Sequence, residues 1–259
     1  MQDFLKNIIK EAGYIGKGFY CEGIEHTIKA DDPTDVVTKA DIEVENFLID
    51  KILSEFPDHG IISEESDSIS PDAEYVWVID PIDGTRNFSR HIAVWCTMIG
   101  IVKNGEPYMG AVYDAINDEL FFGEIGKGAQ LNGKQIKVSD HKEIKDCFIS
   151  YSGGVKNKNS PYDAGNFAGY AKFYDNLRAD HGHWTHNFGS TLSLCHLAAG
   201  RVDAVVMNSG LYHDYLANYI IATEAGAKFT DSDGRDWRKG RKDVVVANPE
   251  LHAKLLSLF

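Results

Sequence analysis

The chain has few cysteines and a deficit of positive charge. Four of its 259 residues are cysteine, and no two of them form a C-x-x-C pair. Scattered cysteines of this kind predict reduced thiols, buried or half-buried, in a cytoplasmic protein, and they argue against a disulfide framework. Lysine and arginine number 26 against 39 aspartates and glutamates, which gives a formal charge of -13. This balance argues against a broad nucleic-acid-binding face.

Long apolar runs are also missing. No stretch approaches the roughly 20 apolar residues that a membrane-spanning helix requires, so we expect no membrane partner. The opening Met1-Gln-Asp-Phe-Leu-Lys is a mixed amphipathic segment and lacks the pattern of a signal peptide. Hydrophobic residues nevertheless make up 43% of the chain, enough to bury a sizeable core in one large or two small domains.

Two amphipathic helices are expected near the beginning of the chain. Apolar residues recur at helical spacing within residues 4–12. Thr38 opens a second helix, with Asp41 at the third position of a capping box. Asp41 can be a capping acid or a functional carboxylate. Residues 22–37 are irregular in pattern, and we interpret them as a solvated loop or as a flap that carries Lys29 towards a phosphate.

An antiparallel block is expected in the middle of the chain. Its strands are predicted at Tyr75–Ile79, Thr97–Val102, Tyr108–Val112 and Glu119–Gly123. Asn104-Gly105 between two of them is a strong hairpin signal. Gly126 and Gly128 precede another Asn-Gly turn, and no helix follows them as a dinucleotide-binding loop would require.

The second half begins with a predicted strand at residues 147–151. Further strands are expected at 201–206, 228–230 and 244–246, and helices at 192–199, at 211–225 and from Pro249 onward. The histidines between Asp180 and His186 lack cysteine partners and an H-x-x-x-H spacing. We therefore interpret them as loop histidines near a substrate pocket in preference to a zinc site.

Two helix starts in this half are candidate binding positions. Gly189 and Ser190 precede the helix from residue 192, a place that suits a phosphate or a sugar hydroxyl but equally suits ordinary capping. Asp214 lies near the start of the next helix. It can reach a metal ion there or serve as an N-terminal capping residue.

The strongest chemical signal is the segment that follows strand 75–79. Asp80 is placed where the strand is expected to end, Pro81 cannot continue a hydrogen-bond ladder, and Gly84 permits a tight turn after Asp83. Two carboxylates at the end of a buried strand are costly unless they are neutralised. A hard cation such as Mg2+ would neutralise them.

A second acidic pair accompanies this segment. Ile61-Ile62 is read as a short strand that delivers Glu64 and Glu65 to the edge of a sheet, in the same half as Asp80 and Asp83. Alternation of helices with strands, together with the antiparallel block, predicts a layered α/β or α+β fold with two sheets.

These motifs resemble the inositol monophosphatase family of Mg-dependent, lithium-sensitive phosphomonoesterases. The resemblance rests on four elements in the family's order across residues 3–256. They are Ser63-Glu64-Glu65-Ser66, Asp80-Pro-Ile-Asp83-Gly-Thr85, His213-Asp214 and Glu224-Ala-Gly226. It implies a five-layered αβαβα sandwich over 1–259, with a metal-binding half at about 1–146 and a substrate half at about 147–259. It also implies a cytoplasmic homodimer that hydrolyses small phosphorylated polyols or amino alcohols with two or three Mg2+ ions.

The resemblance also assigns roles to individual residues. The metal ligands it implies are Glu64, Asp80, the carbonyl of Ile82, Asp83 and Asp214. The catalytic residues it implies are Asp41, Glu64 and Thr85, of which Thr85 and Asp41 position and activate the attacking water. The substrate contacts implied are Asp83, Gly84, Thr85, Gly189, Ser190 and Asp214.

Departures from the family pattern fall on the substrate side. Met207 stands where an acidic residue commonly grips hydroxyl groups, and His213 stands where many members have tryptophan. The segment from Gly189 to Gly200 is one residue short and resembles the histidinol-phosphatase branch. We therefore predict hydrolysis of an inositol or related polyol phosphate, with histidinol phosphate as the alternative. A 3'(2'),5'-bisphosphate nucleotide, or a catalytically silent regulatory subunit, ranks lower.

Overall fold

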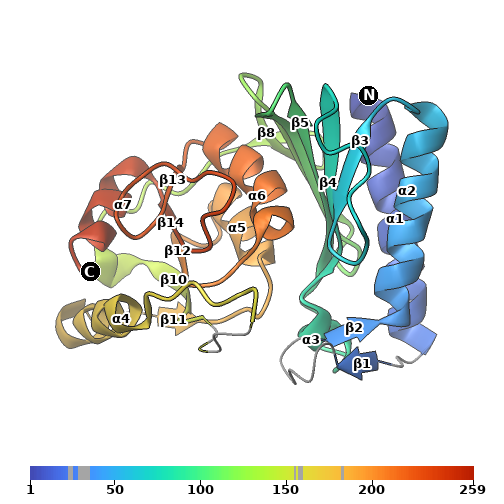
Figure 1. Ribbon diagram of the computed structural model, residues 1–259. Coiled ribbons are helices and arrows are strands. Elements are labelled where there is room, and N and C mark those ends of the chain that lie inside the picture. Colours follow the sequence, from blue (N-terminus) through green and yellow to red (C-terminus); the bar gives the residue numbers. More distant parts are fainter. Residues whose placement is uncertain (23–25, 29–35, 155, 157–159, 182–183) are drawn as a thin grey trace.

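The computed structural model describes residues 1–22, 26–28, 36–154, 156, 160–181 and 184–259 (Figure 1). Two mixed sheets alternate with layers of helices in an αβαβα order. Helices α1 and α2 cover the outer face of the first sheet, α5 and α6 lie between the sheets, and α4 and α7 cover the second sheet. The predicted five-layered sandwich is confirmed.

The helices α1 to α7 have the bounds Gln2–Glu22, Lys39–Glu55, Thr85–Phe88, Phe167–His181, Leu192–Ala198, Tyr212–Glu224 and Pro249–Leu256. The first sheet has the order β3-β4-β5-β6-β7-β8-β9. Its strands are Gly60–Ser63, Tyr75–Asp83, Cys96–Lys103, Glu106–Asp114, Glu119–Glu124, Gly128–Leu131 and Lys134–Ile136. The second sheet has the order β11-β10-β12-β14-β13, with bounds Trp184–His186, Phe148–Ser152, Ala204–Met207, Val244–Ala247 and Lys228–Thr230.

Glycines on the first sheet let helix α6 approach closely. Gly100, Gly110 and Gly123 are paired across β5, β6 and β7. A Cβ atom at Gly110 would lie 2.7 Å from the carbonyl oxygen of Ala217, and one at Gly100 would lie 2.6 Å from the Leu216 side chain. Any side chain there would push α6 away from the sheet, so these glycines set how closely the middle of α6 packs on it.

Strand β4 is longer than the sequence predicted. It continues through Pro81 to Asp83, so the prediction that the strand ends at Asp80 was wrong. The register shifts between the pairs Asp80–Met98 and Asp83–Cys96, which places Pro81 in an irregularity. Because proline has no N–H to donate, such an irregularity is where a strand can hold it. The Pro81 carbonyl is used all the same, since it accepts the Thr97 hydroxyl at 2.9 Å.

Two elements of the second half were missed. Helix α4 covers residues 167–181, for which no helix was predicted. Strand β11 pairs in parallel with β10, so the loop interpretation of the histidine segment that ends at His186 was wrong. Short strands β1, His26–Ile28, and β2, Val36–Thr38, pair in antiparallel fashion within the segment read as irregular. The flap residue Lys29 lies outside the described residues, as does His183.

Several local predictions are confirmed. The Thr38 hydroxyl caps α2, and the Asp41 carboxylate accepts the Thr38 N–H, which completes the capping box. Asn104 and Gly105 have φ of 51° and 82°, as a two-residue hairpin turn requires. Three of the cysteines are buried and reduced, but Cys21 is exposed, contrary to expectation. Within the described residues, no helix is both long and apolar enough to cross a membrane.

Candidate active site

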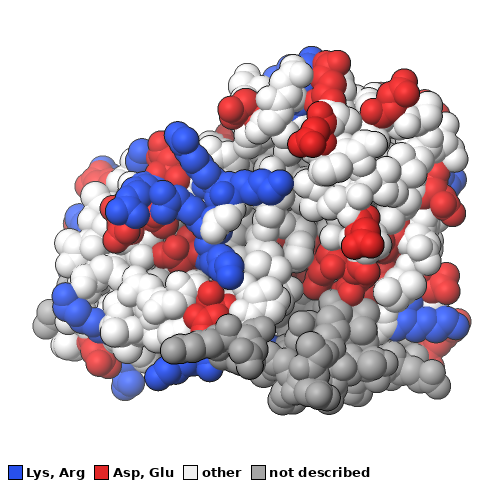
Figure 2. All heavy atoms as spheres, in the orientation of Figure 1, with Lys and Arg blue, Asp and Glu red and all other residues white. Residues whose placement is uncertain are grey.

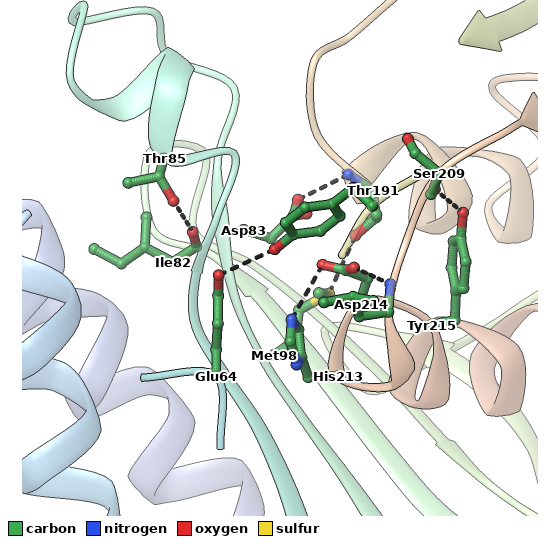
Figure 3. Close-up of polar contacts among 12 residues, drawn as sticks. Glu64, Ile82, Asp83, Thr85, Met98, Thr191, Ser209, His213, Asp214 and Tyr215 are labelled. Carbon is green, nitrogen blue, oxygen red and sulfur yellow. Dashed lines mark hydrogen bonds and ion pairs between the residues drawn. The ribbon is translucent and has the colours of Figure 1, made fainter. Parts of the chain in front are cut away.

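Three buried carboxylates meet between the two halves of the molecule. Asp80 and Asp83 come from the end of β4, and Asp214 comes from the first turn of α6. One oxygen from each lies within 4.8 Å of the others. The three residues are only 1%, 7% and 7% exposed. Figure 3 shows Glu64, Asp83 and Asp214 directed into the same space from separate elements.

A pocket of about 370 Å³ opens beside these carboxylates. The first half lines it with Glu64, Asp80, Ile82, Asp83, Gly84, Thr85, Arg86 and Asn87. The second half lines it with Ser152, Gly153, Gly154, Tyr162, Asn187, Gly189, Ser190, Thr191, Met207, Ser209, Gly210 and Asp214. The pocket therefore gathers every predicted site residue except Asp41. On the face drawn in Figure 2, basic side chains gather over the half with the second sheet, and a group of acidic ones lies on the other half.

Asp83 is held by the helix start that follows Gly189. Its Oδ2 accepts the backbone N–H of Thr191 at 2.8 Å and a short hydrogen bond from the Ser190 hydroxyl. The predicted substrate residue Ser190 therefore uses its hydroxyl on a carboxylate of the cluster. Gly84 lies close by with φ 85°, and a Cβ atom there would lie 3.1 Å from the Ser190 Cβ, so glycine permits the two segments to touch.

Asp214 is held by its own helix. Its Oδ2 accepts a short hydrogen bond from the Leu211 N–H, as a third-position capping acid does. The Asn218 side-chain amide donates to the Asp214 carbonyl at 3.0 Å, and His213 Nε2 lies 3.8 Å from Oδ1. The capping interpretation of Asp214 is confirmed, and its carboxylate also belongs to the cluster, where its role as a metal ligand stays a prediction.

Burial and mutual repulsion disfavour the charged forms of these acids. Burial, followed by the charges of Glu64, Asp83, Asp214 and Asp41, raises the pKa of Asp80 well above its usual value. Burial and Asp214 raise the pKa of Asp83 to about 6, although the hydrogen bonds from Ser190 and Thr191 oppose the shift. Burial also raises the pKa of Asp214.

The donor set fits a hard divalent cation. Asp80 Oδ1 is buried and has no hydrogen-bond partner among the described residues. A buried carboxylate oxygen in that state is costly unless it receives a compensating interaction. Carboxylate oxygens close together are the ligands that Mg2+ prefers.

Glu64 is positioned by a second, buried glutamate. Glu45 on α2 is 3% exposed. Its Oε2 accepts a short hydrogen bond from the Ser63 hydroxyl and the Glu65 N–H at 3.0 Å. These bonds fix the chain on both sides of Glu64 at the end of β3. The Glu64 Oε1 accepts the hydroxyl of Tyr162 at 3.2 Å from the opposite half.

The two predicted water-positioning residues have different surroundings. The Thr85 hydroxyl lies in the pocket wall and donates to the Ile82 carbonyl at 3.0 Å (Figure 3). Asp41 is fully buried in the first turn of α2. Its Oδ2 accepts the Thr38 N–H and hydroxyl at 2.7 and 2.5 Å. Asp41 is close enough to raise the pKa of Asp80, but it does not line the pocket.

Several residues of the pocket wall were not predicted from the sequence. Gly153 and Gly154 follow strand β10. Gly154 has φ 85°, and a Cβ atom there would lie 2.1 Å from the Asn208 carbonyl oxygen. The paired glycines were an available signal for that approach. Asn87 joins the halves by donating to the Val94 and Phe188 carbonyls, both at 2.8 Å. His186, expected near the pocket, lies on β11 and stacks on Phe148 instead.

Comparison with known proteins decides the family. The family model described as the inositol monophosphatase family matches residues 1–259. The chain belongs to the inositol monophosphatase family. It is 32% identical to an inositol-1-monophosphatase of Bacillus subtilis (strain 168) over 263 residues, which cover 100% of this chain and 96% of that one.

Solved structures support the same assignment. The chain superimposes on an inositol monophosphatase from Anabaena (Nostoc) sp. PCC 7120 with a TM-score of 0.83 and 30% identity, covering 99% of this chain and 93% of that one. The extragenic suppressor protein suhB from Bartonella henselae gives a TM-score of 0.89 and 27% identity, covering 99% and 97%. The family includes phosphatases, so phosphatase activity is supported at the level of the reaction, and the substrate is left open.

Proposed function

We propose that the protein is a Mg2+-dependent phosphomonoesterase that hydrolyses a small polyol phosphate, with myo-inositol monophosphate as the first candidate substrate. The observation that carries the proposal is the cluster of Asp80, Asp83 and Asp214 beside a pocket large enough for a sugar-sized ligand. Family membership supplies the reaction class.

The residues that would hold two or three Mg2+ ions are Glu64, Asp80, Asp83, Asp214 and the carbonyl of Ile82. When bound, such ions offset the charge of the phosphate and lower the pKa of a water molecule. No covalent nucleophile is then required. The Ile82 carbonyl accepts the Thr85 hydroxyl and keeps a second lone pair for a further partner.

The chain's own groups would orient the reactants. The backbone amides of Gly84 and Thr85, at the start of α3, are the proposed donors to the phosphate oxygens, and both residues line the pocket. The Thr85 hydroxyl is proposed to orient the attacking water, with Asp41 acting beside it. Gly189 and Ser190 border the ester from the second half. Ser190 also holds Asp83 in place.

The alcohol side of the pocket is built mainly from backbone and neutral groups. Met207 ends β12 in the pocket wall, near Gly153, Gly154 and Ser209. No carboxylate of the second half other than Asp214 lines the pocket within the described residues. Histidinol phosphate is the alternative substrate, although the histidinol-phosphatase branch also normally carries the acid that Met207 replaces, and a 3'(2'),5'-bisphosphate nucleotide ranks lower.

A catalytically silent subunit is the second class of function. The similarity to suhB, which is described as an extragenic suppressor protein, motivates it. The intact set of acids, together with Thr85 in the pocket wall, favours the enzyme.

Phosphate release from a substrate panel tests the proposal. The panel contains myo-inositol monophosphate, histidinol phosphate, fructose 1,6-bisphosphate and a nucleoside 3',5'-bisphosphate, each with excess Mg2+ and with a chelator. We expect Mg2+-dependent release that is highest for the inositol ester. If no ester is cleaved by pure protein in excess Mg2+, the enzyme proposal fails and the silent-subunit class is favoured.

A further inference from the structure

One contact crosses the pocket from the second half to a candidate metal ligand. Tyr162 lies between β10 and α4, and its hydroxyl donates to Glu64 Oε1 at 3.2 Å, 98 residues away in the chain. Glu64 follows β3 at the edge of the first sheet. Tyr162 is half-buried in the pocket wall.

The turn that carries Tyr162 is anchored on its own half. The Tyr162 N–H donates to the buried Ser160 hydroxyl oxygen at 3.3 Å, and the Asp163 N–H donates to the Ser160 carbonyl at 3.1 Å. Lys242, in the connection between β13 and β14, donates to the Asp163 carbonyl at 3.4 Å. The turn is therefore tied to the second sheet, while its tyrosine reaches the first.

A phenol is chemically suited to support a metal-binding carboxylate. It donates one hydrogen bond and brings no charge, so it does not compete electrostatically with a cation. A carboxylate has about four acceptor positions, so it can accept a hydrogen bond and still coordinate a cation. Hydrogen bonds to ligating carboxylates orient them, and their loss typically weakens metal binding by about 10- to 100-fold.

We propose that Tyr162 is a positioning residue that orients Glu64 for metal binding and makes cation affinity depend on the second half of the molecule. This inference rests on the proposed function, since it concerns the same site. Glu45 fixes the backbone around Glu64 from one side. Tyr162 restrains the carboxylate itself from the other. The proposed metal affinity therefore depends on the contact between the 160–163 turn and Glu64.

Calorimetric titration of the metal-free protein with Mg2+ tests the proposal without any substrate. Tyr162→Phe keeps the ring and removes only the hydroxyl, so we expect Mg2+ affinity to fall by about tenfold. The Mg2+ concentration that gives half-maximal turnover of the best panel substrate should rise in parallel with the loss of affinity. Tyr162→Ala also removes the ring. It should weaken Mg2+ binding at least as much and change KM as well, because the pocket wall is lost.

Tyr219→Phe is the matched control. Tyr219 packs on Phe229 and Trp237 and does not line the pocket. Its variant should titrate like the wild type. A Tyr162→Phe protein with unchanged Mg2+ affinity would overturn the proposal, and so would a wild type that binds no Mg2+. If Mg2+ binding weakens as expected but no ester is cleaved by the wild type, the proposed function fails and the role of Tyr162 stands.

Discussion

The two walls of the pocket are built by opposite means. The first-half wall carries charged side chains, with Glu64, Asp80 and Asp83 delivered by two adjacent strands. The second-half wall contributes one carboxylate, Asp214, and otherwise glycine, serine, threonine, asparagine, tyrosine and methionine. Carboxylates around a cation must match its charge and coordination, so the residue types of the first-half wall are restricted. The other wall is constrained mainly in shape, so its residues can vary with the substrate.

The largest expected effect comes from removing a charge from the first-half wall. Asp83→Asn removes one charge from the cluster while it keeps the side-chain volume. We expect kcat/KM to fall at least a thousandfold, about 4 kcal/mol of transition-state stabilisation. Phosphate release with the best panel substrate measures it.

Asp114→Asn is the matched control for this variant. Asp114 is 1% exposed and holds a turn by accepting the N–H groups of Ile116 and Asn117 at 2.9 and 3.1 Å. Its loss should cost stability and leave kcat nearly unchanged. Near-normal turnover by a folded Asp83→Asn protein would contradict the assignment of the cluster.

The second-largest expected effect concerns how folding stability changes with pH in the second half of the molecule. His252 on α7 is 3% exposed, and its Nε2 lies 2.9 Å from the Thr230 hydroxyl. Burial, followed by Lys228, lowers the pKa of His252 to about 4. The unfolded chain therefore binds the proton first. The contribution of neutral His252 to folding stability is therefore complete above the unfolded-state pKa of about 6.5. It is lost as the pH falls towards 4.

Chemical denaturation between pH 7 and pH 4 measures this loss. At about 1.4 kcal/mol per pKa unit, the wild type should lose about 3 kcal/mol through His252. A His252→Gln protein should lack that part of the acid sensitivity. Identical pH profiles for the two proteins would show that His252 is not kept neutral by the fold.

The carboxylate cluster should respond to acid with the opposite sign. The pKa of Asp80 is raised, so without metal its charge destabilises the fold above the unfolded pKa, and this cost is relieved as the pH falls. Asp80→Asn should therefore stabilise the metal-free protein at pH 7 by about 1–3 kcal/mol, the cost of an unsatisfied buried group. It should also abolish most of the stabilisation that Mg2+ gives the wild type.

Thermal unfolding with Mg2+ and with a chelator tests this, with Asp231→Asn as the control. Asp231 is 2% exposed and is paired with Arg241, and it accepts the Arg235 N–H at 2.8 Å. Removing that compensated charge should lower the melting temperature equally in both conditions. A lower melting temperature for metal-free Asp80→Asn would refute the idea that this carboxylate is strained without a cation.

The same contrast explains what could be predicted from the sequence. Asp80, Asp83 and Glu64 stand at or after strand ends in short dense motifs, and Asp214 stands in a first helical turn, so residue type and local position were sufficient. Tyr162 carries no such motif, because it reaches Glu64 through a tertiary contact. Helix α4 was missed for a related reason: its periodicity is weak, and burial of Tyr170, Phe173 and Leu177 against the second sheet stabilises it.

The smallest expected effect comes from a substitution in the second-half wall. The Met207 carbonyl accepts the Tyr170 hydroxyl at 3.0 Å, so the backbone at this position is fixed and the side chain can be exchanged without moving the strand. Met207→Glu adds a charged acceptor to the alcohol side of the pocket. We expect kcat/KM for inositol phosphate to rise by up to about tenfold, close to the 1.4 kcal/mol that a tenfold change represents.

Met207→Gln distinguishes charge from shape in this position, because it offers similar length and a neutral acceptor. It should give a smaller gain than Met207→Glu, and histidinol phosphate should profit from the glutamate through its ammonium group as well. Equal kcat/KM for all three proteins across the panel would mean that residue 207 does not meet the alcohol. Substrate choice would then lie with other residues of the second-half wall.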